Sequence, residues 1–156
     1  MSSMMPFSIC QLTRDDVALM KAMLTMFGEA FDERDTYTKA VPSPVYLQRL
    51  LDSSHFIALA ALKDGTVVGG LVAYELQKFE QERSEIYIYD LAVAATHRRE
   101  GIATALIREL KTTAATRGAY VIFVQADRGD AAAISLYTKL GVREEVLHFD
   151  IEVAKR

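Results

Sequence analysis

The stretch EIYIYDLAVAATHRREGIATA, residues 85–105, decides the fold predicted for this chain. Its first part is rich in β-forming residues, a basic turn with Arg98 and Arg99 follows, and a helical pattern begins after Gly101. The first N–H groups of a helix lack internal partners and carry the positive end of its dipole. The stretch therefore predicts a strand, an anion-binding turn and a helix, with Gly101 letting a phosphate approach the backbone.

Spacing alone leaves this turn open to a plainer interpretation. Its arginines could be solvated, and Gly101 could simply turn the chain. The pattern Arg98-x-x-Gly101-x-Ala103 lacks the Lys-Ser/Thr ending of a Walker loop and the glycine spacing of a dinucleotide-binding turn. The rest of the chain has to decide between the two interpretations.

Hydrophobic periodicity predicts an α/β fold in one domain, residues 1–156, with a mixed, mostly antiparallel sheet flanked by helices. A helical crossover between two strands is right-handed and makes them parallel, so a parallel central pair is expected around the helix that starts at Ile102. Helices are also expected after Thr13, ending near Gly28, and after Ser43, whereas the acidic residues 29–41 show no period. Strands are expected at 7–12, 55–62, 66–76, 85–93, 120–126 (apolar enough to be buried on both faces) and 143–153, with a last helix at 131–140.

Composition excludes several classes of protein. The chain has 156 residues, 51% of them hydrophobic, and a net charge of −3 without a long basic tract, which argues against nucleic acid as a partner and suits a cationic substrate. No apolar run approaches a membrane span, so no membrane partner is expected. The lone Cys10 and the segment MSSMMPFSIC, which lacks a signal-peptide pattern, lead us to expect a cytoplasmic protein. His55 and His148 have no partner at ligand spacing, so no metal is expected.

The strand, the turn and the helix, followed by Leu136-Tyr137 and by Leu140-Gly141-Val142, resemble the GNAT acetyltransferase superfamily. More narrowly, the chain resembles the type I aminoglycoside 3-N-acetyltransferases. The residues that carry this second resemblance lie in FIALAA (56–61), 79–81, 83–93, 97–107, 118–122, 124–127, 136–141 and 143–151. The chain departs from the family at Ala103, where many members have glycine, and at Val142, where phenylalanine is common.

The resemblance implies acetyl-CoA as the acetyl donor. It also implies that Tyr137, in the last helix, protonates the departing thiolate. The residues implied to bind the donor are Leu91, Ala92 and Val93 along the pantetheine arm, Arg98, Arg99, Glu100, Gly101, Ile102, Ala103 and Thr104 around the pyrophosphate, and Asp130 with Tyr137.

Asp90 is the sharpest acceptor-side candidate. In an unbroken strand it would share a face with Ile86, Ile88 and Ala92, and a carboxylate on an apolar face is costly without partners. The alternative is a bulge or an edge position that turns it to water. We expect it to bind the acceptor amine and take its proton. The other residues expected to bind substrate are Asp32, Tyr37, Glu80, Asp127, Asp150 and Glu152, although the last two could equally be the wet face of an edge strand.

The sequence thus predicts an enzyme that acetylates the 3-amino group of the 2-deoxystreptamine ring in gentamicin-like aminoglycosides and so confers resistance. The regiochemistry rests on the resemblance alone, because charge cannot select one amine. A GNAT enzyme for polyamines or protein amines is the main alternative, and a non-catalytic acetyl-CoA sensor is the third. Small molecules are the expected partners, and a homodimer is left open.

Overall fold

The computed structural model of the chain describes residues 6–154. The first half of the segment MSSMMPFSIC, on which the expectation about a signal peptide rests, lies outside the described residues. The chain divides into two compact units, one ending at Gln125 and one beginning at Ala126, and each is described by itself.

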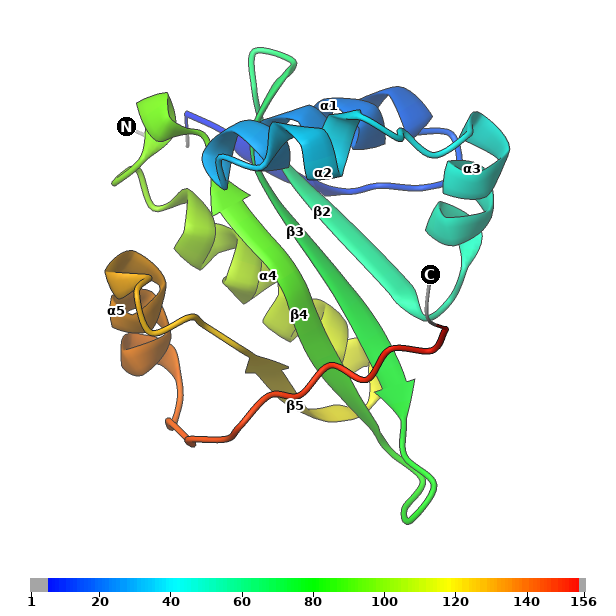
Figure 1. Cartoon of the computed structure of the whole chain (residues 1–156), viewed down its shortest axis with the longest axis vertical. Coiled ribbons are helices and arrows are strands. Elements are labelled where there is room, and N and C mark those ends of the chain that lie inside the picture. Colours follow the sequence, from blue (N-terminus) through cyan, green and yellow to red (C-terminus); the bar gives the residue numbers. More distant parts are fainter. Residues whose placement is uncertain (1–5, 155–156) are drawn as a thin grey trace. The chain divides into compact units, whose positions relative to one another are not determined.

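A five-stranded sheet is the centre of the first unit (Figure 1). Its strands follow one another in chain order, and all neighbours are antiparallel except the last two. Those two are parallel as predicted, but among the described residues the pair lies at the edge of the sheet and not at its centre. The mixed sheet flanked by helices is therefore confirmed. The strands are β1 (Ser8–Gln11), β2 (Phe56–Lys63), β3 (Thr66–Gln77), β4 (Ser84–Val93) and β5 (Ala119–Val124).

Helices cover both faces of this sheet. The helices of the first unit are α1 (Val17–Ala30), α2 (Arg34–Thr38), α3 (Pro44–Asp52), the 3-10 turn η1 (Ala95–His97) and α4 (Ile102–Arg117). Two adjacent glycines of β3 show how closely they pack: a Cβ on Gly70 would meet Met23 of α1 at 2.5 Å, and one on Gly69 would meet Ile102 of α4 at 2.7 Å. A helix thus approaches the backbone of β3 closely on each face of the sheet. Helix α1 lies across the sheet near the end toward which β4 points, and the β3–β4 hairpin projects from the opposite end (Figure 1).

Local signals placed most element ends correctly. Ser43 caps α3 by accepting a hydrogen bond from the N–H of Tyr46 at 3.2 Å. Asp64 and Gly65 form the β2–β3 turn with φ of 51° and 78°, the positive values that a tight hairpin requires. Gly118 ends α4 in the left-handed conformation. None of the helices in the described ranges is long and apolar enough to span a bilayer.

The region after α1 differs from the prediction. Gly28 does not end that helix but lies in its last turn, and the supposedly irregular residues 29–41 contain the short helix α2. The reason is close packing, because a Cβ on Gly28 would lie 3.1 Å from the Cα of Arg34 and 3.3 Å from the Cβ of Tyr37. A glycine that serves helix–helix contact thus looked, in the sequence, like a helix terminator.

Strand β5 is more exposed than predicted. Its residues Tyr120 and Val121 are exposed, although its apolar run predicted burial on both faces. Within the described residues it pairs only with β4, so it is an edge strand of the sheet. An apolar run identifies a strand but does not state how many neighbours the strand has.

The second unit contains α5 (Ala131–Leu140), which begins and ends as predicted. The predicted strand at residues 143–153 is wrong, since this segment forms no strand. Its apolar side chains, Val146, Leu147, Phe149, Ile151 and Val153, are all exposed. Alternation fixes which side chains would share a face, but a strand also needs a neighbouring backbone to pair with, and the pattern does not supply one.

Candidate functional site

The first part of the site is the turn between β4 and α4. After Val93 the chain makes η1, and Arg98 and Arg99 then lead into Gly101, which precedes the first turn of α4. Gly101 has φ of 81°, and Arg99 also has a positive φ, 63°. A Cβ on Gly101 would meet nothing within 4 Å. What requires glycine here is thus the backbone angle rather than a crowded neighbour inside the protein.

This turn presents backbone donors toward its opening. The first N–H of α4 with an acceptor in the helix is that of Ala105, bonded to the carbonyl of Gly101 at 3.0 Å. The preceding N–H groups lie at the positive end of the helix dipole. Glu100 is held aside, since its carboxylate contacts Lys63 Nζ at 3.5 Å and His97 Nδ1 at 3.2 Å. The two arginines and the free donors together suit a phosphate group.

The second part of the site is a β-bulge in β4. Ile88 pairs with Ala73 and Asp90 pairs with Val72, so Tyr89 is an extra residue without a partner in β3. The extra residue reverses the alternation. Ile88 stays on the face packed by α4, whereas Asp90 turns to the face of Val72. The expected shared face of Asp90 with Ile86 and Ile88 is therefore wrong. The bulge that was weighed as the alternative is present, but it leaves Asp90 half-buried and does not turn it fully to water.

Asp90 is half-buried and has a partner that lies far away in the sequence. The hydroxyl of Tyr37 in α2 donates a hydrogen bond to its Oδ2 at 2.9 Å. The Tyr37 ring is held by Phe27 and Phe31, with ring centroids 6.0 and 5.9 Å away. The structure therefore brings together Tyr37 and Asp90, two of the residues predicted to bind substrate.

The electrostatic setting of Asp90 favours the acid form more than usual. Burial raises the pKa of its carboxyl, the nearby charge of Glu33 raises it further, and the hydrogen bond from Tyr37 opposes both effects. For Tyr37 itself, burial and the bond to Asp90 raise the pKa, so its hydroxyl stays protonated as a donor. A carboxylate with a raised pKa, half open to solvent, is the type of group that accepts a proton from an amine.

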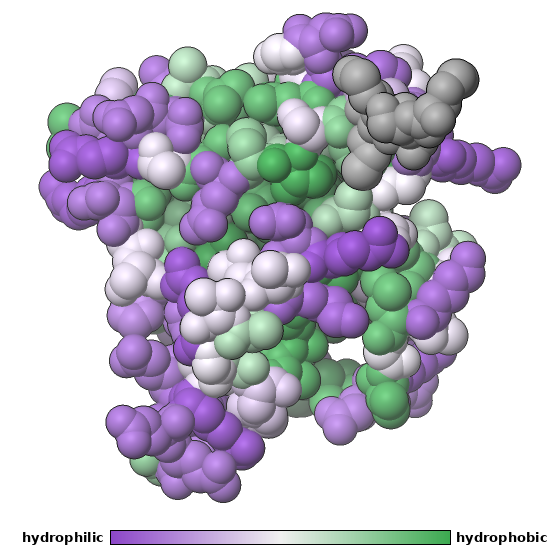
Figure 2. All heavy atoms as spheres, turned by 180° about the vertical axis from the view of Figure 1, so that it is seen from behind, coloured by the Kyte–Doolittle hydropathy of each residue, from purple (hydrophilic) through white to green (hydrophobic). Residues whose placement is uncertain are grey.

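The other acidic candidates of the first unit are Glu80 and Asp32. Glu80 is at the tip of the β3–β4 hairpin, where it pairs with Lys78 at 3.4 Å. Six residues of strand, roughly 20 Å, separate this end of β4 from Asp90. The tip is a hydrophilic projection in the view from behind (Figure 2). Asp32 is exposed on the α1–α2 connection, with φ of 54°.

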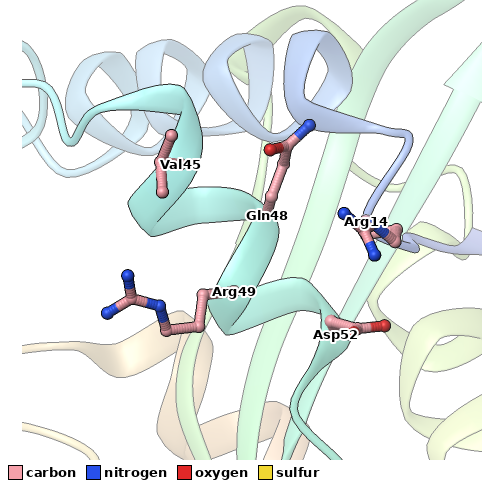
Figure 3. A pocket seen from close by; sticks show the side chains of 5 residues that line it. All are labelled: Arg14, Val45, Gln48, Arg49 and Asp52. Atoms are coloured by element: carbon pink, nitrogen blue, oxygen red, sulfur yellow. The ribbon is translucent and has the colours of Figure 1, made fainter.

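A shallow pocket of about 240 Å³ lies beside α3, and none of the predicted site residues lines it (Figure 3). It is lined by Arg14, Val45, Gln48, Arg49 and Asp52. Three of its five side chains carry charge, and Figure 3 shows that four of the five come from α3 and that Arg14 comes from the segment before α1. Within residues 6–154, no three His, Cys, Asp or Glu side chains cluster as metal ligands would.

The second unit holds the remaining candidates. Asp130 caps α5 by accepting from the N–H of Ala133 at 3.1 Å, and the carbonyl of Asp127 accepts from the N–H of Asp130 at 3.0 Å. Desolvation raises the pKa of Tyr137 to about 12, and the charge of Asp130 adds to the effect, so this phenol is a proton donor and not a base. Asp150 is exposed and contacts His148 Nε2 at 2.8 Å, and Glu152 is exposed.

Sequence reasoning missed two contributors near Asp90. Glu33 was noticed only as one charge of an acidic run, and Tyr89 only as a β-former. Neither has a local signature, because Glu33 acts through the placement of α2 and Tyr89 through the bulge.

The sequence of this chain matches a known protein family over most of its length. The pattern of the acetyltransferase (GNAT) family matches residues 19–142, from α1 to the end of α5. The chain belongs to the acetyltransferase (GNAT) family. The strand, bulge, turn and helix at residues 84–117 all lie within the matched region.

Two crystal structures of aminoglycoside acetyltransferases from uncultured soil metagenomic samples are similar over nearly the whole chain. The aminoglycoside acetyltransferase HMB0005 is 64% identical, with a TM-score of 0.94 and coverage of 95% of this chain and 99% of that one. The aminoglycoside acetyltransferase meta-AAC0020, in complex with sisomicin, is 29% identical, with a TM-score of 0.89 and coverage of 96% and 97%.

A curated relative from Rattus norvegicus, N-acetyltransferase family 8 member 2, is 29% identical over 104 residues, which is 67% of this chain. The chain spans only 46% of the length of that relative.

Proposed function

We propose that this protein transfers the acetyl group of acetyl-CoA to the 3-amino group of the 2-deoxystreptamine ring in gentamicin-like aminoglycosides. Such a reaction removes a cationic charge from the antibiotic and confers resistance. The observation that carries the proposal is the 64% identity, at a TM-score of 0.94, to a protein described as an aminoglycoside acetyltransferase. The chain would act as one catalytic domain in the cytoplasm.

Acetyl-CoA binds along the end of β4 and the following turn in this proposal. The free N–H groups at the start of α4, with Arg98 and Arg99, fit a pyrophosphate. The backbone of Leu91, Ala92 and Val93 bonds the pantetheine arm. Ile102, Ala103 and Thr104 contribute through the first turn of the helix, and Asp130 lies at a second helix N-terminus. Glu100, paired with Lys63 and His97, orders the turn.

The acceptor amine must lose a proton before it attacks the thioester. Asp90 is the group we assign to bind this amine and accept the proton, directly or through water. Its raised pKa brings it closer to the pKa of the group it serves, and Tyr37 holds its carboxylate in place. Because its hydroxyl is already bonded to Asp90, Tyr37 serves as a positioning residue rather than as a direct contact to substrate.

The departing thiolate of coenzyme A also needs a proton. Tyr137 is the residue we assign to supply it, on the strength of the family resemblance and of a phenol that stays protonated through neutral pH. Asp32, Glu80, Asp127, Asp150 and Glu152 remain proposals as acceptor contacts. Glu80 is the weakest of them, since it lies at the hairpin tip.

The structure of the acetylated product tests both whether the protein acetylates aminoglycosides and which amine it acetylates. The enzyme is incubated with gentamicin and acetyl-CoA, the product is isolated, and the new amide is located by NMR. We expect acetylation at the 3-amino group. Acetylation at the 6′ or 2′ amine would overturn the regiochemistry alone. Absence of any aminoglycoside product, together with brisk acetylation of spermidine, would make the protein a polyamine acetyltransferase instead.

A further inference from the structure

An aromatic row crosses the sheet beside Asp90. Phe56 of β2 pairs in register with Tyr74 of β3, Tyr74 with Tyr87 of β4, and Tyr87 with Phe123 of β5. One ring per strand, on one face, thus spans four neighbouring strands. Phe56 and Tyr74 meet edge to face with centroids 5.4 Å apart, and Tyr87 stacks on Phe123 at 4.7 Å and 5°.

The bulge adds a fifth ring to this row. Tyr89 lies between the two central members, 5.8 Å from the Tyr74 centroid and 5.9 Å from that of Tyr87, edge to face with both. It is 61% exposed, and Tyr74 is 36% exposed. Rings that complete a core are buried on folding, as Phe56 is. Tyr89 instead displays its ring at the surface of the sheet, one residue before Asp90.

Charge identifies the class of ligand that this surface fits. Beside the effect of burial, the charge of Asp90 raises the pKa of the Tyr74 and Tyr87 hydroxyls, so the carboxylate lies near both rings. The charge of Glu33 in turn raises the pKa of Asp90. An aromatic face attracts cations through its quadrupole and packs well against the C–H face of a saturated ring. A carboxylate beside such a face adds a full negative charge. A cationic, polyhydroxylated ring satisfies both features, whereas an apolar ligand or an anion satisfies only one or neither.

We propose that Tyr74, Tyr87 and Tyr89 form an acceptor subsite on which an amino-substituted sugar or cyclitol ring stacks while its ammonium neighbours Asp90. This inference rests on the proposed function and deepens it, since it names the surface that distinguishes a ring-bearing acceptor from a linear polyamine. Tyr89 is the specificity-determining residue, because it is the most exposed ring of the three and lies closest in the chain to the carboxylate.

Direct binding is measured first, without turnover. The chain has seven tyrosines and no tryptophan, so uniform 3-fluorotyrosine labelling gives a small ¹⁹F NMR spectrum that single Tyr→Phe substitutions assign. Titration with gentamicin in the absence of acetyl-CoA should shift the signals of Tyr74 and Tyr89. The signal of Tyr120, whose hydroxyl is bonded to Glu85 at the hairpin end of the sheet, should stay in place.

Kinetics then separate the ring from its hydroxyl. Tyr89→Leu should raise the KM for gentamicin about five- to tenfold and leave the KM for acetyl-CoA unchanged. Tyr89→Phe, which keeps the aromatic face, should have a smaller effect. The matched control is Phe79→Leu, which removes a fully exposed ring from the hairpin tip and should change neither KM. The loss for spermidine should be smaller than that for gentamicin.

The outcomes distinguish this inference from the proposed function. Unmoved Tyr74 and Tyr89 signals, with normal gentamicin acetylation by Tyr89→Leu, would overturn the subsite and leave the function intact. Shifted signals without any acetylated product would support the subsite and overturn the function. An equal KM increase for spermidine would overturn the ring contact. Absence of gentamicin binding to the unmutated protein would overturn both.

Discussion

The proposed acetyl-CoA site and the proposed acceptor site are formed by different parts of the residues, although strand β4 contributes to both. The turn after Val93 is made by backbone: positive φ values at Arg99 and Gly101 and a helix start with unpaired N–H groups. The acceptor side is made by side chains, with Asp90 held by Tyr37 from 53 positions away in the sequence. A backbone site tolerates most single substitutions, because every residue type except proline supplies an N–H. A side-chain site depends on each of its members.

Asp90→Asn should produce the largest effect and tests the side-chain end directly. The amide keeps the size but removes the charge and the base, so kcat/KM for the aminoglycoside should fall about 10³-fold. Acetyl-CoA affinity should not change, and isothermal calorimetry with acetyl-CoA measures this. Asp64→Asn, in the β2–β3 turn, is the control for loss of one surface charge. A change in stability alone would make Asp90 a structural residue.

Tyr137→Phe should lower the rate without weakening coenzyme A binding, as Asp90→Asn should and as Gly101→Val should not. Packing is preserved, and only the hydroxyl that we assign to protonate the thiolate is lost. We expect kcat to fall about 10²-fold with little change in coenzyme A binding. Pre-steady-state kinetics establish whether chemistry limits the rate. Tyr120→Phe removes another phenol as a control, and equal rates for both variants would leave Tyr137 as a packing residue.

Gly101→Val tests the backbone end. Valine disfavours φ of 81° strongly, at a cost of about 1–3 kcal/mol of stability, and it also places a branched side chain at the anion-binding turn. Coenzyme A affinity should fall at least about tenfold. Gly118→Val is a closely matched control, since Gly118 has φ of 77° at the other end of the same helix. It should lose similar stability but keep its affinity, and equal affinity losses in both variants would refute a local role for Gly101.

Tyr37→Phe should have the smallest effect and is read from pH dependence. The hydroxyl lowers the pKa of Asp90 against the larger effect of burial, so removing it should raise that pKa further. The base form then appears only at higher pH, and the acidic limb of the kcat/KM profile should move to higher pH, with a few-fold loss near neutrality. Thr38→Val, which removes another hydroxyl from α2, should leave the limb in place. An unmoved limb in Tyr37→Phe would remove its positioning role.

The difference between the two ends also explains what the sequence could predict. The turn was predictable because its causes are adjacent: strand formers, two arginines and a glycine within residues 85–105. The caps at Ser43 and Asp130 and the stop at Gly118 were predictable for the same reason. Asp90 was singled out as a polar residue in an apolar strand, but its face was predicted wrongly. An extra residue such as Tyr89 leaves no mark in a run of β-formers.

Longer-range causes account for the remaining differences. Helix α2 has five residues and no local period, and its position depends on the space left by Gly28. The link from Tyr37 to Asp90 depends in turn on α2. The alternation at residues 143–153 predicted a strand, but pairing requires a neighbour that alternation does not specify. Each of these features is set by a contact between segments, whereas the predictable ones are set within a few residues.

The bulge in β4 also shortens the spacing between side chains that share one face of the strand. In a regular strand, residues that share a face are two apart, about 6.6 Å along the axis. The bulge turns the consecutive residues Tyr89 and Asp90 to one face, and their Cα atoms are only about 3.8 Å apart. An aromatic ring and a carboxylate at this spacing can contact the same small molecule at the same time. A single inserted residue thus places two different binding groups side by side on one face of a strand, whose side chains otherwise alternate between its two faces.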